Sequence, residues 1–258
     1  MVNSNLKIDI RRKKILEILR RNGKVYVSEL SETLGATPVT IRTDLAALES
    51  EGHLIRMSGG AINSQQNTAV SPVDTNLQQQ YSEKKSIAVS VAKFLNDGST
   101  LFINSGSTTK IIAEELKRRK NLNIVTNSLA VATILGDHPS FCVILLGGEI
   151  NSQYGFTYGG DAQEQLNRYQ ADWAILSVDS ICAQSGITTF HAEEAVIDRM
   201  MINCAQKTMI AADYTKIGRA GFSRVCECSS PIQLITNVNA PEEHISSIME
   251  TGITVKLV

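Results

Sequence analysis

A run of small polar residues follows an apolar stretch near the middle of the chain. The strand-like segment TLFIN leads directly into Ser105, Gly106, Ser107, Thr108 and Thr109. A helix is expected from residue 108 to residue 117. Backbone N–H groups at a helix N-terminus, with hydroxyls beside them, can bind a phosphate. A capped turn without a ligand explains the same residues, but open parallel sheets bind ligands at the carboxyl ends of their strands, which favours a phosphate site.

Other expected strands also end in polar residues or glycines. In a parallel sheet these strand ends meet at one rim, so their side chains are expected to converge. Carboxylates there would accept hydrogen bonds from sugar hydroxyls, while N–H groups and a lysine would bind a phosphate. The expected effector contacts from these segments and the following helix are Asn127, Gly148, Asp179, Glu194 and Lys216.

Three residues near the expected helix 192–205 have two interpretations each. Glu193 and Glu194 lie in the first turn, where the helix dipole favours carboxylates with or without a ligand; one of them can also meet sugar hydroxyls. His191 lies in the preceding loop, where it is either exposed or hydrogen-bonded within the protein, or in contact with the ligand.

Basic residues are concentrated at the N-terminus. Residues 1–60 hold ten Lys and Arg against seven Asp and Glu, whereas the remainder holds fifteen against nineteen. Arg42 can contact a guanine edge or a phosphate, although it and the basic run at 11–14 can also simply solvate helix surfaces. The glycines after Arg56 would let a backbone approach DNA closely. The expected DNA contacts are Thr37, Val39, Thr40, Arg42, Thr43, Arg56, Ser58, Gly59 and Gly60.

The elements that would carry these contacts fit within sixty residues. A first helix is expected over 6–22, and a second begins at a Ser28 N-cap and ends at Gly35. A third starts with Thr37 as N-cap and Pro38 in the first turn. The segment HLIRMSGGAIN predicts a strand, a glycine turn and a second strand. Residues 6–60 therefore predict a winged helix-turn-helix domain, α-helical with a small β wing.

The rest of the chain divides into a linker and an α/β domain. Residues 61–80 are rich in Asn, Gln, Ser and Thr, which indicates a linker. Within residues 81–258, strand-like segments such as TLFIN, NIVTN, CVILL and WAILS alternate with helical ones. This alternation predicts an α/β domain with a mostly parallel sheet.

Composition excludes several classes of protein. The chain has 258 residues, of which 43% are hydrophobic and 20% charged, and it shows no long apolar run or signal peptide. We therefore expect a cytoplasmic protein. Its five cysteines are odd in number and mostly in apolar surroundings, which favours reduced thiols. Cys226 and Cys228 have no further Cys or His at the sequence spacing that metal sites use, so neither a metal nor another cofactor is expected.

The N-terminal segment TPVTIRTDLAALESEGHLIRMSGGA resembles the signature of the DeoR family of bacterial repressors. In that signature a Val-Ser pair precedes the third helix, and TIRRDL lies within it. This chain has Ala36-Thr37, which keeps a hydroxyl cap, and Thr43 in place of the second arginine. The resemblance implies operator binding, and the change at Thr43 implies an altered or weakened contact.

The resemblance extends through INSGSTT, VTNSLAVA, LLGG, GITTF and ADYTKIGRAGF. It implies a C-terminal domain similar to ribose-5-phosphate isomerase that senses a phosphorylated sugar or sugar alcohol. Within the family, the sequences of these motifs are most similar to those of repressors for hexitols and amino sugars. Differences at Asn104, His191 and Tyr214–Thr215 fall where effector selectivity would be set.

An enzyme is the main alternative. The similar isomerases carry an Asp-Gly-Ala-Asp pattern and then a lysine, whereas this chain reads Leu176-Ser177-Val178-Asp179 with no lysine over 180–206. Because isomerisation requires a base near a carbon-bound proton, the loss of a carboxylate and a cation favours binding over turnover. A homodimer or homotetramer released from its operator by the effector is the expected regulator; an activator or nucleoid-type protein is a further alternative.

Overall fold

The computed structural model describes residues 8, 11–19, 24–50, 54–57, 59–63, 80–229 and 231–258. The chain forms two compact units, residues 1–71 and 72–258. The boundary falls inside the predicted linker. Its first residues are an exception, since residues 61–63 belong to a strand rather than to a linker.

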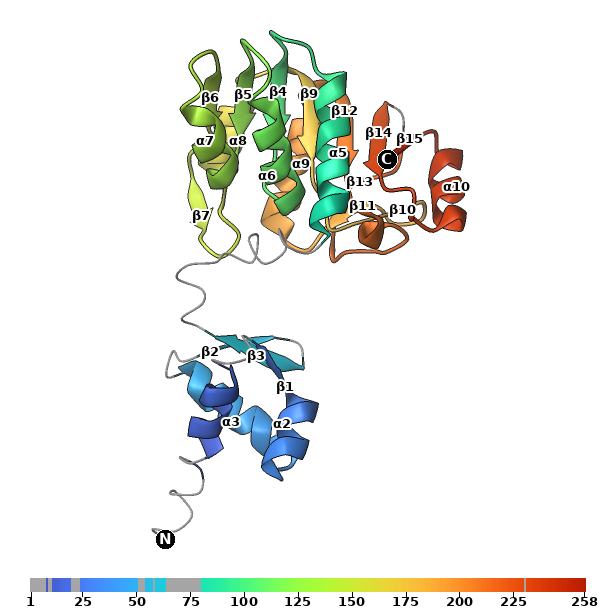
Figure 1. The fold of residues 1–258 in the computed structure, drawn as a ribbon. Helices are drawn as coiled ribbons and strands as arrows, with labels where there is room; N and C mark the ends of the chain where they lie inside the picture. The colour runs from blue at the N-terminus through green and yellow to red at the C-terminus, as the bar shows by residue number, and fades with distance from the viewer. Residues whose placement is uncertain are drawn as a thin grey trace. The chain divides into compact units, whose positions relative to one another are not determined.

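The first unit contains three helical segments and a small sheet (Figure 1). Residues 11–19 are helical. The elements that follow are β1 (Lys24–Tyr26), α2 (Val27–Leu34), α3 (Pro38–Ser50), β2 (Leu54–Met57) and β3 (Gly60–Asn63). The strands are antiparallel in the order β1-β3-β2. The expected wing is therefore present, with β1 as a third strand.

Helical spacing of apolar residues builds the core of this unit. Ile41, Leu45 and Leu48 of α3 are at most 2% exposed and pack with Ile15 and Leu30 from the preceding helices. Gly35 ends α2 as predicted, in the left-handed conformation with φ 60°. The predicted Ser28 N-cap is wrong, because α2 already begins at Val27, whose N–H donates to the Gly59 carbonyl at 2.8 Å.

The second unit is built on a seven-stranded sheet in which every pairing is parallel. Its order is β15-β14-β12-β9-β4-β5-β6. The bounds are β4 (Thr100–Ile103), β5 (Asn123–Thr126), β6 (Cys142–Leu145), β9 (Ala171–Leu176), β12 (Ala205–Ala211), β14 (Ile232–Thr236) and β15 (Thr254–Leu257). The parallel sheet predicted from sequence is confirmed.

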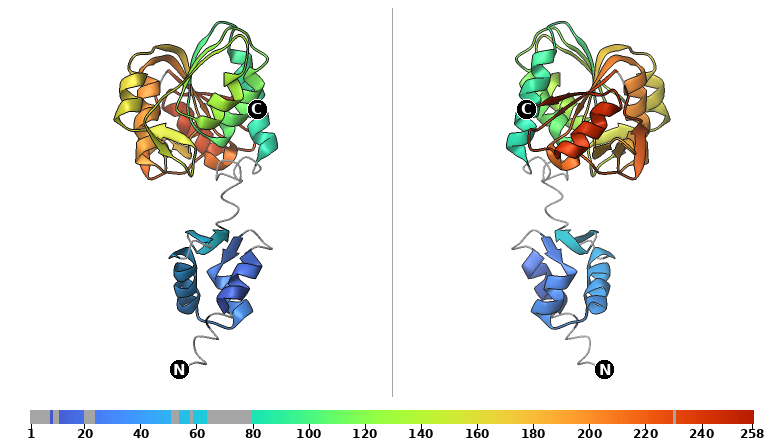
Figure 2. Two further views of the ribbon diagram at one scale, coloured as in Figure 1. Left: turned by 90° about the vertical axis from the view of Figure 1, so that its left-hand side faces the viewer. Right: turned by 90° about the vertical axis from the view of Figure 1, so that its right-hand side faces the viewer.

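Helices cover both faces of this sheet (Figure 2). One face carries α5 (Tyr81–Phe94), α6 (Ser107–Leu116) and α7 (Leu129–Gly136), and the other α8 (Gly160–Leu166), α9 (Ala192–Asn203) and α10 (Glu242–Glu250). Each face of the sheet packs against its helices in a separate hydrophobic core, because successive side chains of a strand point to opposite faces, as in β4. Leu101 and Ile103 point into the first, whereas Phe102 points into the second.

Smaller elements cross the carboxyl ends of the strands. They are the hairpin β7 (Glu149–Asn151) and β8 (Phe156–Tyr158), the antiparallel sheet β10 (Ser180–Cys182), β11 (Gly186–Thr189) and β13 (Ser223–Cys226), and the 3-10 turn η2 (Tyr214–Lys216). The chain passes from β4 to β5 and β6 on one side and places β9 and β12 on the other. The strand order therefore reverses between β4 and β9, where open α/β sheets bind ligands.

No helix in the described ranges is both long and apolar enough to cross a membrane.

Candidate functional site

The start of α3 presents an exposed polar edge. Thr40 N–H donates to Thr37 Oγ1 at 3.2 Å, which confirms Thr37 as the N-cap. Val39 is 69% exposed, and Arg42 and Thr43 are also exposed. The Thr43 hydroxyl donates to the Val39 carbonyl at 3.0 Å, so it can only accept a further hydrogen bond. This edge has the residues that a DNA-reading helix needs.

The opposite face of α3 is held by a buried ion pair. Asp44 is 2% exposed, and its two carboxylate oxygens lie 2.5 Å from Arg11 Nε and 3.2 Å from Arg12 Nε. These two arginines therefore do more than solvate the first helix. They fix α3 against it, which orients the exposed edge.

The glycines of the wing differ in environment. Gly59 is exposed, with φ 81°, and remains available for a close approach to DNA. Gly60 is buried, and a Cβ there would lie 2.0 Å from the Val25 carbonyl oxygen. The packing of β3 against β1 accounts for this glycine without a DNA contact, so the predicted contact at Gly60 has no support from its surroundings. Ser58 lies outside the described residues, and only the backbone of Arg56 is described.

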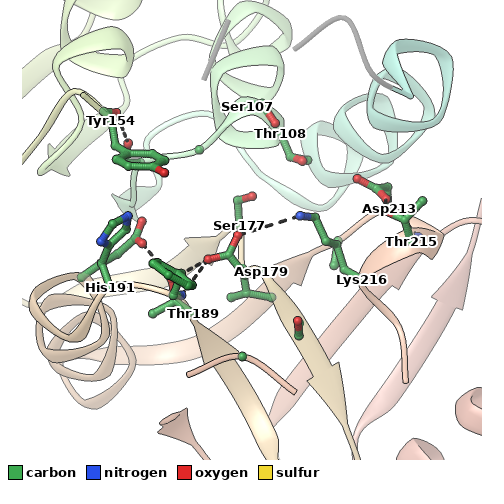
Figure 3. Close-up of a pocket in the computed structure, with 18 of the residues that line it drawn as sticks. Ser107, Thr108, Tyr154, Ser177, Asp179, Thr189, His191, Asp213, Thr215 and Lys216 are labelled. Atoms are coloured by element: carbon green, nitrogen blue, oxygen red, sulfur yellow. Dashed lines mark hydrogen bonds and ion pairs between the residues drawn. The ribbon is translucent and has the colours of Figure 1, made fainter. Parts of the chain in front are cut away.

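A cavity of about 470 Å³ lies where the strand order reverses (Figure 3). This volume is in the range of small-molecule sites. Of the predicted effector contacts, the structure brings together Ser105, Gly106, Ser107, Thr108, Asp179, Glu194 and Lys216. The lining residues that sequence reasoning did not place at the site include Gln80, Lys84, Tyr154, Ser177, Thr189, Phe190 and Gly221.

One end of the cavity is suited to an anion. The turn from Ser105 to Thr108 places the N-terminus of α6 at the cavity wall. A Cβ on Gly106 would lie 2.7 Å from Ser177 Cβ, so only glycine allows this turn to pack so closely. Thr109, in contrast, is fully buried and its hydroxyl donates to the Gly106 carbonyl at 3.1 Å. Thr109 therefore stabilises the turn and does not line the cavity, contrary to the prediction.

Two lysines add positive charge to this end. Lys216 lies on η2, and Lys84 comes from the first turn of α5, where it is 3% exposed. Burial lowers the pKa of Lys84, while the negative charge of Asp213 opposes this shift. Lys84 was missed because no helix was predicted over 81–94. Helical spacing could have found it. Lys84 precedes the buried Ile87 and Ala88 by three and four residues, which places all three on the same face of a helix.

The other end of the cavity carries carboxyl groups. Asp179 Oδ2 accepts hydrogen bonds from Phe190 N–H at 2.8 Å and the Thr189 hydroxyl at 3.0 Å, and its Oδ1 lies 3.9 Å from Lys216 Nζ. The Thr189 hydroxyl also lies 2.7 Å from Glu194 Oε2. Burial raises the pKa of Glu194 to about 7. Burial also raises the pKa of Asp198, which lies one helical turn below.

His191 and Tyr154 close this end from the side of the β7–β8 hairpin (Figure 3). Their ring centroids are 4.4 Å apart in an edge-on arrangement. His191 Nε2 is buried and has no hydrogen-bond partner within the described residues. This favours the ligand-contact interpretation of His191 over an exposed or internally hydrogen-bonded side chain.

Two predicted contacts lie outside the cavity lining. Asn127 Nδ2 donates to the Thr157 carbonyl at 3.2 Å, and Gly148 packs so that a Cβ would lie 2.4 Å from the Tyr158 carbonyl oxygen. Both residues hold the hairpin that carries Tyr154, and neither is in the wall. The predictions of direct contact are therefore wrong.

No cluster of three or more His, Cys, Asp or Glu in the described part of the chain is arranged to hold a metal ion.

Two family models match the chain. The DeoR-like helix-turn-helix domain matches residues 11–67, and the DeoR C terminal sensor domain matches residues 79–238. The second match alone covers more than half of the chain.

Named repressors are similar over most of the chain. The glycerol-3-phosphate regulon repressor of Escherichia coli K12 is 31% identical over 94% of this chain and 96% of its own. The putative aga operon transcriptional repressor of Escherichia coli O157:H7 is 29% identical over 96% and 93%. The repressor GlcR of Bacillus subtilis is 29% identical over 86% of each chain.

Solved structures that are similar include ribose 5-phosphate isomerase A from Methanocaldococcus jannaschii, at 14% identity, a TM-score of 0.39 and 52% of each chain. A probable sor operon regulator from Shigella flexneri is 13% identical, with a TM-score of 0.38, and the match covers 57% of this chain and 82% of that one. The two matched domains and the full-length similarity to named repressors lead to one assignment: the chain belongs to the DeoR family of transcriptional regulators.

Proposed function

We propose that this protein represses an operon for carbohydrate uptake or catabolism and that a phosphorylated sugar or sugar alcohol releases it from its operator. The class of effector is inferred from the distribution of charged groups along the cavity. A helix N-terminus and two lysines lie towards one end, where the carboxyl group of Asp213 accepts from Thr215. Asp179 and Glu194 lie at the other end, and one of the lysines, Lys216, lies between the two ends. A phosphate requires donors and sugar hydroxyls require acceptors, so such a ligand matches both ends.

The DNA contact is assigned to the exposed edge of α3 and to the wing. Arg42 would contact a base edge or a phosphate, and Val39 would make apolar contact with a thymine methyl group. The hydroxyls of Thr37 and Thr40 and the backbone at Gly59 would contact phosphates. The Thr43 hydroxyl, whose proton goes to the Val39 carbonyl, would instead accept from the amino group of a base. Relatives of this chain are named as repressors of sugar-related operons, which supports the same direction of control.

The geometry argues against an isomerase. A base must be free to take a proton from a carbon atom, but Asp179 already accepts from Phe190 and Thr189 and faces Lys216. Position 176, where the isomerase pattern has its first aspartate, is a fully buried leucine. The expected product assay is therefore negative: incubation of the protein with pentose and hexose phosphates should give no aldose–ketose conversion.

We further propose a homodimer or homotetramer assembled through the sensor domains, since two-fold symmetric regulators bind repeated or palindromic half-sites. The protein would act in the cytoplasm, where the operator is found.

The test is fluorescence anisotropy of the full-length protein on the DNA upstream of its own gene, with and without a panel of phosphates. The panel includes glucose 6-phosphate, sorbitol 6-phosphate, galactitol 1-phosphate and galactosamine 6-phosphate, with the unphosphorylated sugars as controls. Salt-sensitive, sequence-selective binding that one phosphate relieves is the expected result. Operator affinity that stays unchanged with every phosphate would refute the inducer mechanism, and a lack of selective DNA binding would refute the repressor.

A further inference from the structure

Asn104 lies beneath the cavity and contacts the elements that carry both of its ends. It is the first residue after β4, is fully buried, and directly precedes the anion-binding turn at Ser105. It does not line the cavity. It is therefore placed to act on the ligand only through its neighbours.

The amide of Asn104 is bonded in both directions to the segment that follows β9. Its Oδ1 accepts from Ser177 N–H at 2.9 Å, and its Nδ2 donates to the Ser177 carbonyl at 2.9 Å. Ser177 is two residues before Asp179. Since Gly106 also packs directly on Ser177, the anion-binding turn and the Asp179 segment are joined at one residue.

The same amide reaches α9. Asn104 Nδ2 lies 2.9 Å and 3.0 Å from the two carboxylate oxygens of Asp198, which is fully buried. Glu194 is one helical turn before Asp198, so its position depends on how α9 is held. Only an amide provides the acceptor for Ser177 N–H together with donors for Ser177 and Asp198.

We propose that Asn104 is a positioning residue that couples the anion-binding end of the cavity to its carboxyl end. An anion bound at the Ser105–Thr108 turn would thereby order the segments of Asp179 and Glu194, which receive the rest of the ligand. This inference rests on the proposed function, because it takes the turn to be the phosphate site. It predicts that phosphate alone affects α9 at residues 192–198, at the other end of the cavity.

Hydrogen–deuterium exchange of the full-length protein, with inorganic phosphate as the probe, tests this. In the wild type we expect phosphate to slow exchange at residues 104–110 and also at 177–180 and 192–198. In Asn104→Leu, which is similar in shape but apolar, the slowing should no longer reach 192–198. Loss of the amide should also speed exchange at 177–180 without phosphate by at least about tenfold, since two hydrogen bonds to Ser177 are lost.

Thr100→Val is the matched control. Thr100 links the N-terminal ends of β4 and β9, whereas Asn104 lies at their C-terminal ends. The Thr100 hydroxyl donates to Asp172 Oδ2 at 2.8 Å and accepts from Asp172 N–H at 2.8 Å. It loses a similar link between the same two strands, but away from the cavity. We expect it to transmit the phosphate effect as the wild type does.

Asn104→Asp combined with Asp198→Asn covers the case in which Asn104→Leu does not fold. The pair exchanges donor and acceptor between positions 104 and 198 at constant charge, although the Ser177 carbonyl loses its donor. The phosphate effect should therefore again reach 192–198. Transmission to 192–198 that persists in Asn104→Leu would overturn the proposal, as would its absence at 192–198 in the double variant. If phosphate does not slow exchange at 104–110 in the wild type, the proposed phosphate site fails. The exchange at 177–180 without phosphate then decides whether Asn104 holds this segment.

Discussion

The Thr189 hydroxyl lies between two carboxyl groups and has one proton to donate. It is 2.7 Å from Glu194 Oε2 and 3.0 Å from Asp179 Oδ2, so both contacts are hydrogen bonds only if one carboxyl is itself protonated. Asp179 Oδ2 also accepts from Phe190 N–H at 2.8 Å, and its Oδ1 lies 3.9 Å from Lys216 Nζ, whereas Glu194 has neither contact. The proton therefore belongs to Glu194, which would donate to Thr189 while Thr189 donates to Asp179.

This arrangement makes the stability of the sensor domain depend on pH. Burial raises the pKa of Glu194 from its usual 4.5 to about 7 in the folded protein. The folded state therefore holds the proton more tightly than the unfolded state does. The resulting stabilisation is fully present below pH 4.5 and is lost as the pH rises through 7. At 1.36 kcal/mol per pKa unit, the shift corresponds to about 3 kcal/mol.

Glu194→Gln should remove the contribution of Glu194 to this dependence and leave that of the buried Asp198, because the amide is permanently neutral and can donate to Thr189 as the protonated acid does. The variant should match the wild type at pH 5 and exceed its free energy of unfolding at pH 8 by up to about 3 kcal/mol. Urea unfolding followed by tryptophan fluorescence measures this in the full-length protein. Trp173, on β9, is the single tryptophan of the chain, so the signal reports on the sensor domain.

Glu193→Gln is the control, since Glu193 is exposed on the same helical turn and its loss changes the net charge equally. It should leave the pH dependence of unfolding unchanged. The assignment of the proton to Glu194 is refuted if Glu194→Gln and the wild type lose stability in parallel between pH 5 and pH 8.

Three further outcomes are expected. Arg42→Ala should weaken operator affinity at least about tenfold in anisotropy titrations, with a salt slope lower by about 1 if the lost contact is to a phosphate. Gly60→Ala should destabilise the wing by about 2 kcal/mol or more, seen as faster amide exchange over 24–26 and 60–63, because the new Cβ would collide with the Val25 carbonyl. Lys84→Met should lower the affinity for sorbitol 6-phosphate at least about tenfold in calorimetry, since the buried ammonium at the anion-binding end is removed. Lys85→Met, which breaks a pair between the partly exposed Lys85 and the buried Glu115 outside the cavity lining, should not lower that affinity.

Local sequence was enough to predict the residues that directly follow strands or begin helices. The turn at 105–108, Asp179 and Lys216 follow apolar strands, so the parallel sheet alone brings them to one rim. Likewise, the N-cap residue Thr37 and the first-turn residue Pro38 indicate where α3 begins. These predictions need only the position of each residue relative to its own element.

Residues that reach the cavity from a third layer could not be predicted in this way. Tyr154 lies in the loop of the β7–β8 hairpin, and Thr189 lies on β11, in the small antiparallel sheet across the strand ends. Their place depends on pairings between segments far apart in the chain. Conversely, Asn127 and Gly148 occur at the expected strand ends but are used to hold that hairpin, a role that strand position alone does not distinguish from ligand contact.

The position of α5 indicates how a ligand could influence DNA binding. The chain leaves β3 at Asn63, and the first described residue of the second unit is Gln80, which lines the cavity next to Lys84. A phosphate bound by Lys84, as proposed, would contact the first turn of α5, which is the first element described after residue 63. Such a ligand changes operator affinity only if it binds the two states of the repressor unequally. A difference of about 1.4 kcal/mol between those affinities changes operator binding tenfold, which is comparable to one charge-assisted hydrogen bond at this turn.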